Sequence, residues 1–304
     1  IDLNGRTAVV ASLAGAGAVT NAAVTNASLI FATGVATTST FSGVLSGNLG
    51  VVKYGFATQV LSGANTFVGN IQVNDGTLVA GSATALGAAT NLVAVNGGTL
   101  DLTGAAGLAN AITLNSGALV GGQVAIANVT LVTGSVSTQL SGTGSLAKSA
   151  AGTLTLSGAN TYSLGTDIQS GTVSFSAANN LGTGSVAVAA GATALFSGAS
   201  GNATLANAFT GAGVLRLNLA GATAANTFLT GDNSGFTGTI QVGGTATSNK
   251  FNTTGFTGTG ATVTVDDANT IIVPATGATF AGLTIVGAGN TENLGALRIV
   301  AGGT

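Results

Sequence analysis

Short apolar runs, interrupted every few positions by glycine, asparagine, serine or threonine, extend along the whole chain. None of them keeps the i, i+3, i+4, i+7 spacing of an amphipathic helix for more than one turn. Valine, isoleucine, leucine and threonine dominate the runs, and these residues favour strands. The pattern therefore predicts an all-β protein built from short strands.

The stretch 41–104 shows this pattern most clearly. Strands are predicted at 71–73, 77–79, 92–95 and 99–102, with turns at 74–76 and 96–98. The turns contain asparagine and glycine, which adopt positive φ at little cost. Farther along, threonine alternates with leucine at 153–156, which predicts a strand with one polar and one apolar face.

One seven-residue motif occurs twice, as LSGANTF at 61–67 and as LSGANTY at 156–162, 95 residues apart (156 − 61). The same offset carries Lys53 onto Lys148, so about sixty residues are duplicated in register. Self-similarity at a fixed period is the signature of repeat architectures. The motif positions are Leu61, Gly63, Asn65 and Phe67 in the first copy, Leu156, Gly158, Asn160 and Tyr162 in the second, and Phe236 in a looser third copy.

The fold class that fits these repeats is an elongated, right-handed parallel β-helix, or β-solenoid, of stacked rungs. Roughly 20–25 residues per rung would give about 12–15 rungs. A β-sandwich also uses short strands, but it does not predict an ungapped internal duplication. No shift in composition marks a boundary, so 1–304 is predicted to be one continuous solenoid segment. Its repeats are expected at about 41–104, 136–198 and 205–304, with 1–40 the end of a preceding unit.

Composition excludes several classes of protein. Only 5% of the 304 residues are charged, and the formal net charge is −2, which argues against nucleic-acid binding. Mean hydropathy is +0.59, yet no apolar run approaches the 18 residues of a membrane-spanning helix, so no membrane insertion is expected. Histidine and cysteine are absent, which removes catalytic triads, thiol nucleophiles and cysteine–histidine zinc sites.

The few charged side chains are interpreted as structural. The one adjacent pair of acids, Asp266 and Asp267, would point to opposite faces of a strand and is assigned to a turn or a solvated edge. We therefore expect no catalytic residue, metal ligand or cofactor. Lys53 and Lys148 occupy the same repeat position and are interpreted as cations at a rung surface. Arg216 lies near the equivalent position of the third copy.

The aromatic residue and the asparagine of the motif are also interpreted as structural. Phe67, Tyr162 and Phe236 are predicted to be aromatic anchors, packed in the interior or over a bend, in preference to sugar-stacking residues. Asn65 and Asn160 would either stack into an amide ladder or form a turn.

The sequence from Gly152 to Tyr162, GTLTLSGANTY, resembles the passenger-associated transport repeats of bacterial autotransporter-type surface proteins, as do the segments that follow it at 171–173 and 180–188. The resemblance covers most of the chain except roughly 243–285. It implies a β-helical passenger that acts at the outer cell surface or outside the cell, commonly as an adhesin or surface layer.

The two ends of the chain match each other in the phase of the repeat. Read from tail to head, Gly302, Gly303 and Thr304 followed by Ile1, Asp2 and Leu3 reproduce the internal GGTLDL at 97–102. Two hypotheses follow: a tandem repeat within a longer protein, which we favour, or head-to-tail stacking of separate chains.

The sequence thus predicts a non-enzymatic structural or adhesive protein that forms a filament or cell-surface fibre, for adhesion, biofilm formation or surface coating. Its expected partners are itself, through continuation and lateral bundling, and host or abiotic surfaces or glycans. A glycan-binding or glycan-cleaving β-helix is the main alternative, and binding to ice or crystal surfaces is a third.

Overall fold

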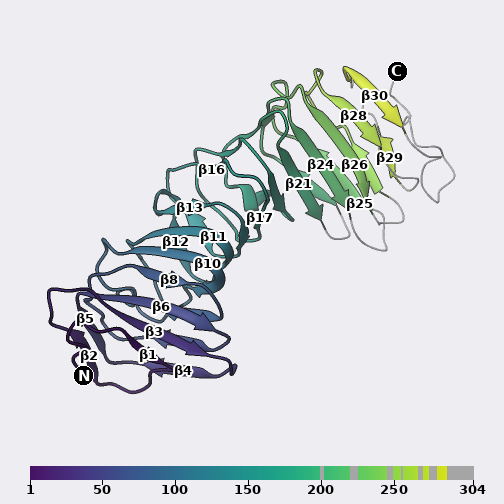
Figure 1. Ribbon diagram of the computed structural model, residues 1–304. Helices are drawn as coiled ribbons and strands as arrows, with labels where there is room; N and C mark the ends of the chain where they lie inside the picture. Colours follow the sequence, from purple (N-terminus) through teal and green to yellow (C-terminus); the bar gives the residue numbers. More distant parts are fainter. Residues whose placement is uncertain are drawn as a thin grey trace. The chain divides into compact units, whose positions relative to one another are not determined.

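The computed structural model describes residues 1–198, 202–219, 225–244, 249–254, 256–265, 270–273 and 279–285. Within these ranges the chain forms strands, turns and two 3₁₀ helices, η1 (Ile126–Asn128) and η2 (Ala178–Leu181), without an α-helix. No helix in these ranges is long and apolar enough to cross a membrane. Contacts divide the chain into two compact units, Ile1–Gly142 and Thr143–Thr304. Each unit is a stack of chain turns, called rungs below (Figure 1).

The parallel strands of unit 1 lie on three faces, and the strands of one face are together called a sheet below. The first contains β1 (Ala8–Val10), β3 (Ala27–Thr33), β6 (Leu49–Gly55), β8 (Ile71–Val73), β10 (Leu92–Asp101), β11 (Ala111–Val120) and β13 (Val129–Leu131). The second contains β4 (Thr38–Phe41), β7 (Thr58–Leu61), β9 (Thr77–Ala80), the second halves of β10 and β11, and β14 (Gly134–Val136). The third contains the pairs β2 (Ala18–Asn21) with β5 (Val44–Gly47) and β12 (Gln123–Ala125) with β15 (Gln139–Ser141).

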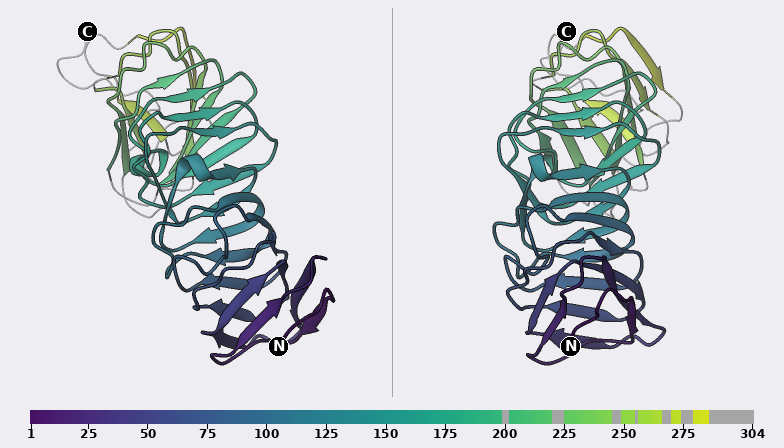
Figure 2. Two further views of the ribbon diagram at one scale, coloured as in Figure 1. Left: turned by 90° about the vertical axis from the view of Figure 1, so that its left-hand side faces the viewer. Right: turned by 60° about the vertical axis from the view of Figure 1, so that its left-hand side comes forward.

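Unit 2 also has three parallel sheets. The largest contains β17 (Thr153–Leu156), β19 (Thr172–Phe175), β21 (Thr193–Gly198), β24 (Val214–Leu219), β26 (Thr239–Gly244), β28 (Thr262–Val265) and β30 (Gly282–Ile285). The second contains β16 (Leu146–Lys148), β18 (Thr166–Ile168), β20 (Val186–Val188) and β23 (Phe209–Thr210). The third contains β22 (Ala203–Leu205), β25 (Ala225–Leu229), β27 (Asn249–Asn252) and β29 (Thr270–Val273). Figure 2 shows how the strands of each unit lie above one another on separate faces.

Rung length varies along the chain. Within the described ranges, the shortest repeat between paired residues of two strands is 16, from Gln123 to Gln139, and the longest is 26, from Ala18 to Val44. Every pairing of named strands is parallel, as stacking of successive turns requires and a β-sandwich of antiparallel hairpins does not. The predicted β-solenoid is confirmed, with about 12 turns. Its right hand stays a prediction, based on the strong preference for right-handed crossovers, and so do the repeat boundaries.

Inward-pointing side chains form apolar ladders. In unit 2 one ladder runs through Leu154, Val173, Ala194, Leu215, Ile240 and Val263, and all six are buried. Beside it, the rings of Phe175 and Phe196 are in contact in a tilted arrangement, with centroids 5.5 Å apart and an interplanar angle of 51°. Burying one valine, leucine or phenylalanine contributes about 1.5–3 kcal/mol. The ladders therefore hold the rungs in register, since a one-residue slip would turn each strand's apolar set outward.

One predicted turn is part of a strand instead. Residues 96–98 lie inside β10, where the pairing with β11 shifts register at Val95/Asn96 and at Asn96/Thr99. The chain bends there while both of its halves remain paired with β11. The asparagine and the glycines thus make a bend within a continuous ladder, which a sequence pattern does not separate from a turn.

Candidate functional site

The duplicated motif lies in the interior of each unit. Leu61 ends β7, and Leu156 ends β17, and both are buried. Two residues after Leu61, Gly63 passes so close to the preceding rung that a Cβ built on it would lie 1.8 Å from the carbonyl oxygen of Gly43. Gly158, at the equivalent position of the second copy, is also buried. A glycine is needed at Gly63 because the neighbouring rung leaves no room for a side chain.

Asn65 and Asn160 bind the backbone of neighbouring rungs. Asn65 Oδ1 accepts the Leu45 N–H at 2.8 Å, while its Nδ2 donates to the Ala85 carbonyl at 2.7 Å. In the second copy, Asn160 Nδ2 donates to the Asn180 carbonyl at 2.5 Å. Both side chains are buried. Each asparagine therefore replaces a missing backbone partner across the gap between rungs.

The aromatic residues of the motif are enclosed. Phe67, Tyr162 and Phe236 are at most 1% exposed, so their rings do not face solvent. The Tyr162 hydroxyl lies 2.6 Å from Thr166 Oγ1, which in turn donates to the Leu181 carbonyl at 3.1 Å. Burial raises the pKa of Tyr162 to about 12, only partly offset by this hydrogen bond. The position thus serves packing, and a bound sugar would not reach it.

The interpretation of Lys53 and Lys148 as surface cations is wrong, because neither side chain is exposed to solvent. Lys53 Nζ donates to the carbonyl oxygens of Tyr54 and Gly55, each at 2.8 Å, and lies 3.4 Å from that of Asp75. Lys148 Nζ donates to Ala150 and lies 3.4 Å from the carbonyl oxygen of Ala151.

These inward lysines bind turn carbonyls. Burial lowers the pKa of both lysines, and the negative charge of Asp75 partly offsets this for Lys53. Arg216 differs from them, because its partly exposed side chain donates to Gln241 Oε1 on the next strand at 3.2 Å.

Space for each lysine comes from a glycine on the next rung. Gly76 (φ 59°) and Gly171 (φ 70°) lie 23 residues after the lysines (76 − 53 and 171 − 148). A Cβ at these glycines would lie 2.7 Å and 3.0 Å from the two Nζ atoms. The recurrence of a lysine and a glycine at one spacing is the sequence signal that could have revealed the internal cation.

Only part of the proposed end-to-end junction is described. The Ile1 amino group donates to the Ala18 carbonyl at 2.8 Å, Asp2 pairs with Thr20, and the Leu3 N–H donates to Thr20 at 2.8 Å. Hydrogen bonds from the Asn4 and Ala22 N–H groups lower the pKa of Asp2. Gly302, Gly303 and Thr304 lie outside the described residues, so the junction stays a prediction.

Two acids in the described part of the chain accept hydrogen bonds from residues two positions farther along. Asp101 accepts from Thr103, and Asp232 accepts from Ser234. Within the described ranges no three metal-binding side chains come together. Asp266 and Asp267 lie outside these ranges.

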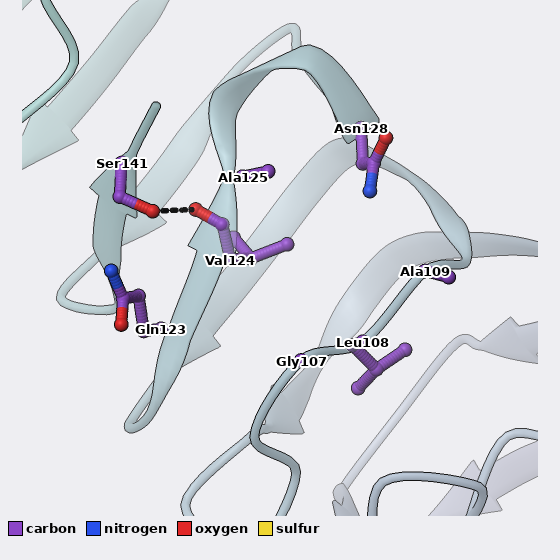
Figure 3. Close-up of a pocket in the computed structure, with 8 residues that line it drawn as sticks. All are labelled: Gly107, Leu108, Ala109, Gln123, Val124, Ala125, Asn128 and Ser141. Carbon is purple, nitrogen blue, oxygen red and sulfur yellow. Dashed lines mark hydrogen bonds between the residues drawn. The ribbon is translucent and has the colours of Figure 1, made fainter. Parts of the chain in front are cut away.

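Among the pockets on the surface of the described residues, three have volumes of about 420, 280 and 220 Å³. The largest lies in unit 1, beside β12, and Figure 3 shows its lining, which includes Gly107, Leu108, Gln123, Asn128 and Ser141. The other two are lined by residues around 178–207 in unit 2 and around 26–72 in unit 1. The side chains of all three pockets are amides, hydroxyls and apolar groups, which bind ligands without transferring protons at neutral pH.

Fold and site together define a parallel β-solenoid with internal repeats and surface pockets. A sequence profile of the family called "Passenger-associated-transport-repeat" matches residues 51–80 and 146–175, two stretches that are themselves 95 residues apart (146 − 51). The two matches contain Lys53, Gly76, Lys148 and Gly171, and also Leu61, Asn65 and Tyr162 of the motif.

The chain is also 46% identical over 98 residues to "Adhesin BmaC autotransporter" of Brucella suis biovar 1 (strain 1330). That alignment covers 32% of this chain and 3% of the relative, so the chain spans only a small part of that protein. No solved structure matches the chain. Together, the two similarities confirm the autotransporter passenger predicted from the sequence. Both similarities are to repeats or proteins of the autotransporter type, and each covers only part of the chain.

Proposed function

We propose that this chain is a segment of the shaft of an adhesive fibre on a bacterial surface. The observation that carries the proposal is the placement of the family repeat. Both matches contain the asparagine that binds a neighbouring rung, the buried lysine that binds turn carbonyls, and the glycine that leaves space for this lysine. Similarity to an adhesin supports the adhesive part of the proposal.

The mechanism is mechanical. Within each unit, backbone ladders and apolar stacks make a stiff stack of rungs, which holds its outer face away from the cell. That face is almost uncharged, so lateral contacts with other copies or with host or abiotic surfaces meet little electrostatic repulsion. Along β1, β3 and β6 it carries the outward row Val9, Ile30 and Val52, of which Val9 is 66% exposed. In this proposal, the filament grows by continuation of the ladders from copy to copy, and filaments associate by lateral bundling.

Two measurements on the bacterium that makes the protein test the proposal. Antibodies against residues 1–142 should label intact cells, and an in-frame deletion of residues 1–304 should lower adherence to host cells and to abiotic surfaces several-fold. Export of the shortened protein, followed through an epitope outside the deletion, is the control. Labelling only after permeabilisation, or unchanged adherence with normal export, would contradict the proposed function.

A further inference from the structure

The third sheet of unit 1 is interrupted at one rung. Its ladder runs from β2 to β5 and continues to the next rung, where Thr66 donates to the Leu45 carbonyl at 2.9 Å. One rung farther, Ala88 donates to the Phe67 carbonyl at 3.0 Å. The ladder resumes with the pairing of β12 and β15.

Residues 107–109 occupy the rung between these two parts. In unit 1, which is described throughout, they form no backbone hydrogen bond with β12. Their neighbour Asn110 uses its buried side chain instead, donating to the Ala88 carbonyl at 2.9 Å and to that of Asn91 at 3.2 Å. One side of the rung is thus closed by a side chain, and the side toward β12 is open.

The open side exposes a strand edge. Val124 lies opposite Leu140, and Gln139 donates to the Gly122 carbonyl at 3.2 Å, so the peptide groups of Val124 face β15. Those of Gln123 and the N–H of Ala125 face the other way, because successive residues alternate in direction along a strand. Among the hydrogen bonds of unit 1, none engages the Gln123 N–H, the Gln123 carbonyl or the Ala125 N–H.

A cleft of about 420 Å³ lies along this edge, and we call it the β12 cleft. Figure 3 shows the segment Gly107–Ala109 passing beside β12, with the side chains of Val124 and Asn128 directed toward the space between them. Leu108 and Val124 are buried and form an apolar floor, while Gln123 and Ser141 lie at the rim. Gly107 leaves open space, with no atom within 4 Å of the position a Cβ would take.

We propose that the β12 cleft binds an extended, uncharged peptide segment of a partner protein, which adds as a strand to the free edge of β12. The three unpaired peptide groups supply the main-chain hydrogen bonds of strand addition. The floor accepts a small or β-branched side chain, and a charged one would lose its hydration without gaining a partner. The proposal rests on the adhesive function above, to which it adds a class of partner.

The test uses the purified chain and capped octapeptides composed of Ser, Thr, Val, Ala and Asn, with affinity measured by titration. Ala125→Pro removes the edge N–H, and the φ of −69° at this residue already suits proline. Ala125→Ser keeps the N–H and is the matched control. A peptide should bind the wild-type chain and the serine variant equally within twofold, and the proline variant at least tenfold more weakly.

A second measurement guards against misfolding of the proline variant. In the wild-type chain, hydrogen exchange of the Gln123 and Ala125 amides should slow when peptide is added. Failure of every peptide to bind, equal binding by both variants, binding without this protection, or a response to a neutral oligosaccharide in place of peptide would overturn the proposal. Peptide binding without any effect of the deletion on adherence would contradict the proposed function and leave the cleft in place.

Discussion

At the scale of single residues, the buried lysines are the feature that the sequence pattern misplaced. An alternation of apolar and polar positions assigns lysine to the surface, where nearly all lysines lie. Lys53 and Lys148 point inward because the carbonyl oxygens of a turn accept the ammonium protons and a glycine on the next rung leaves space. Only the structure shows that these oxygens converge, since they belong to the backbone and leave no trace in residue type.

Lys53→Met should destabilise unit 1 by about 2–4 kcal/mol, because the turn carbonyls lose their donor while the volume is kept. Urea unfolding of the variant measures the loss. Arg6→Met, which also removes one cation but from an exposed side chain, is the control and should change stability by less than about 0.5 kcal/mol. Equal unfolding midpoints for the two variants would contradict a buried Lys53 and would indicate a solvent-exposed side chain.

Tyr162 predicts a defined response to alkaline pH. Its pKa is about 12 in the folded chain against an ordinary value of 10.0, so folding favours the protonated phenol. Its contribution is complete below pH 10 and is lost as the pH rises from 10 to 12, by about 2–3 kcal/mol in total. Tyr162→Phe, which copies the residue of the first repeat, should flatten this part of the stability curve. An unchanged slope in the variant would show that other groups cause it.

At the scale of elements, close approach of rungs explains the glycine of the motif. Gly63→Ala should cost more than about 2 kcal/mol, because the new methyl group would overlap the Gly43 carbonyl and force the rung to move. Gly34→Ala is the matched control, since nothing lies within 4 Å of its Cβ position. Thermal unfolding of both variants checks the prediction, and similar midpoints would contradict the packing described here.

Individual strands could be predicted well where residue alternation was regular. The strand predicted at 71–73 is β8, and the alternation at 153–156 is β17, with its leucines buried and its threonines exposed. Prediction was poorer where glycine bends a strand without ending it, as in β10. The open edge of β12 left no signal, because it depends on which backbone groups remain unpaired when the rungs stack.

At the scale of the whole molecule, the duplication at 95 residues was the strongest signal in the sequence, since an ungapped repeat requires units that stack alike. It predicted the solenoid, whereas the family of the repeats was predicted from the resemblance of residues 152–162 and of the segments that follow them. Partners, bundling and the end-to-end junction depend on surfaces of other molecules or on residues outside the described ranges, and a sequence pattern carries neither.

The central claim is that successive rungs pair in parallel register in a chain presented at the cell surface. These 304 residues contain no cysteine, so introduced cysteine pairs do not compete with other thiols of the same segment. Thr155 lies opposite Ser174 on the next rung, and Ser174 lies opposite Leu195 on the rung after that. Adjacent strands lie about 4.8 Å apart, within reach of a short thiol-bridging reagent, whereas two rungs are about twice as far.

The measurement is the cross-linking of cysteine pairs on intact bacteria with a fluorogenic, membrane-impermeant thiol-bridging reagent. The Thr155→Cys/Ser174→Cys chain should become fluorescent, and the control Thr155→Cys/Leu195→Cys should not. Equal reaction of both pairs, or reaction of the first pair only after the cells are broken open, would contradict the account.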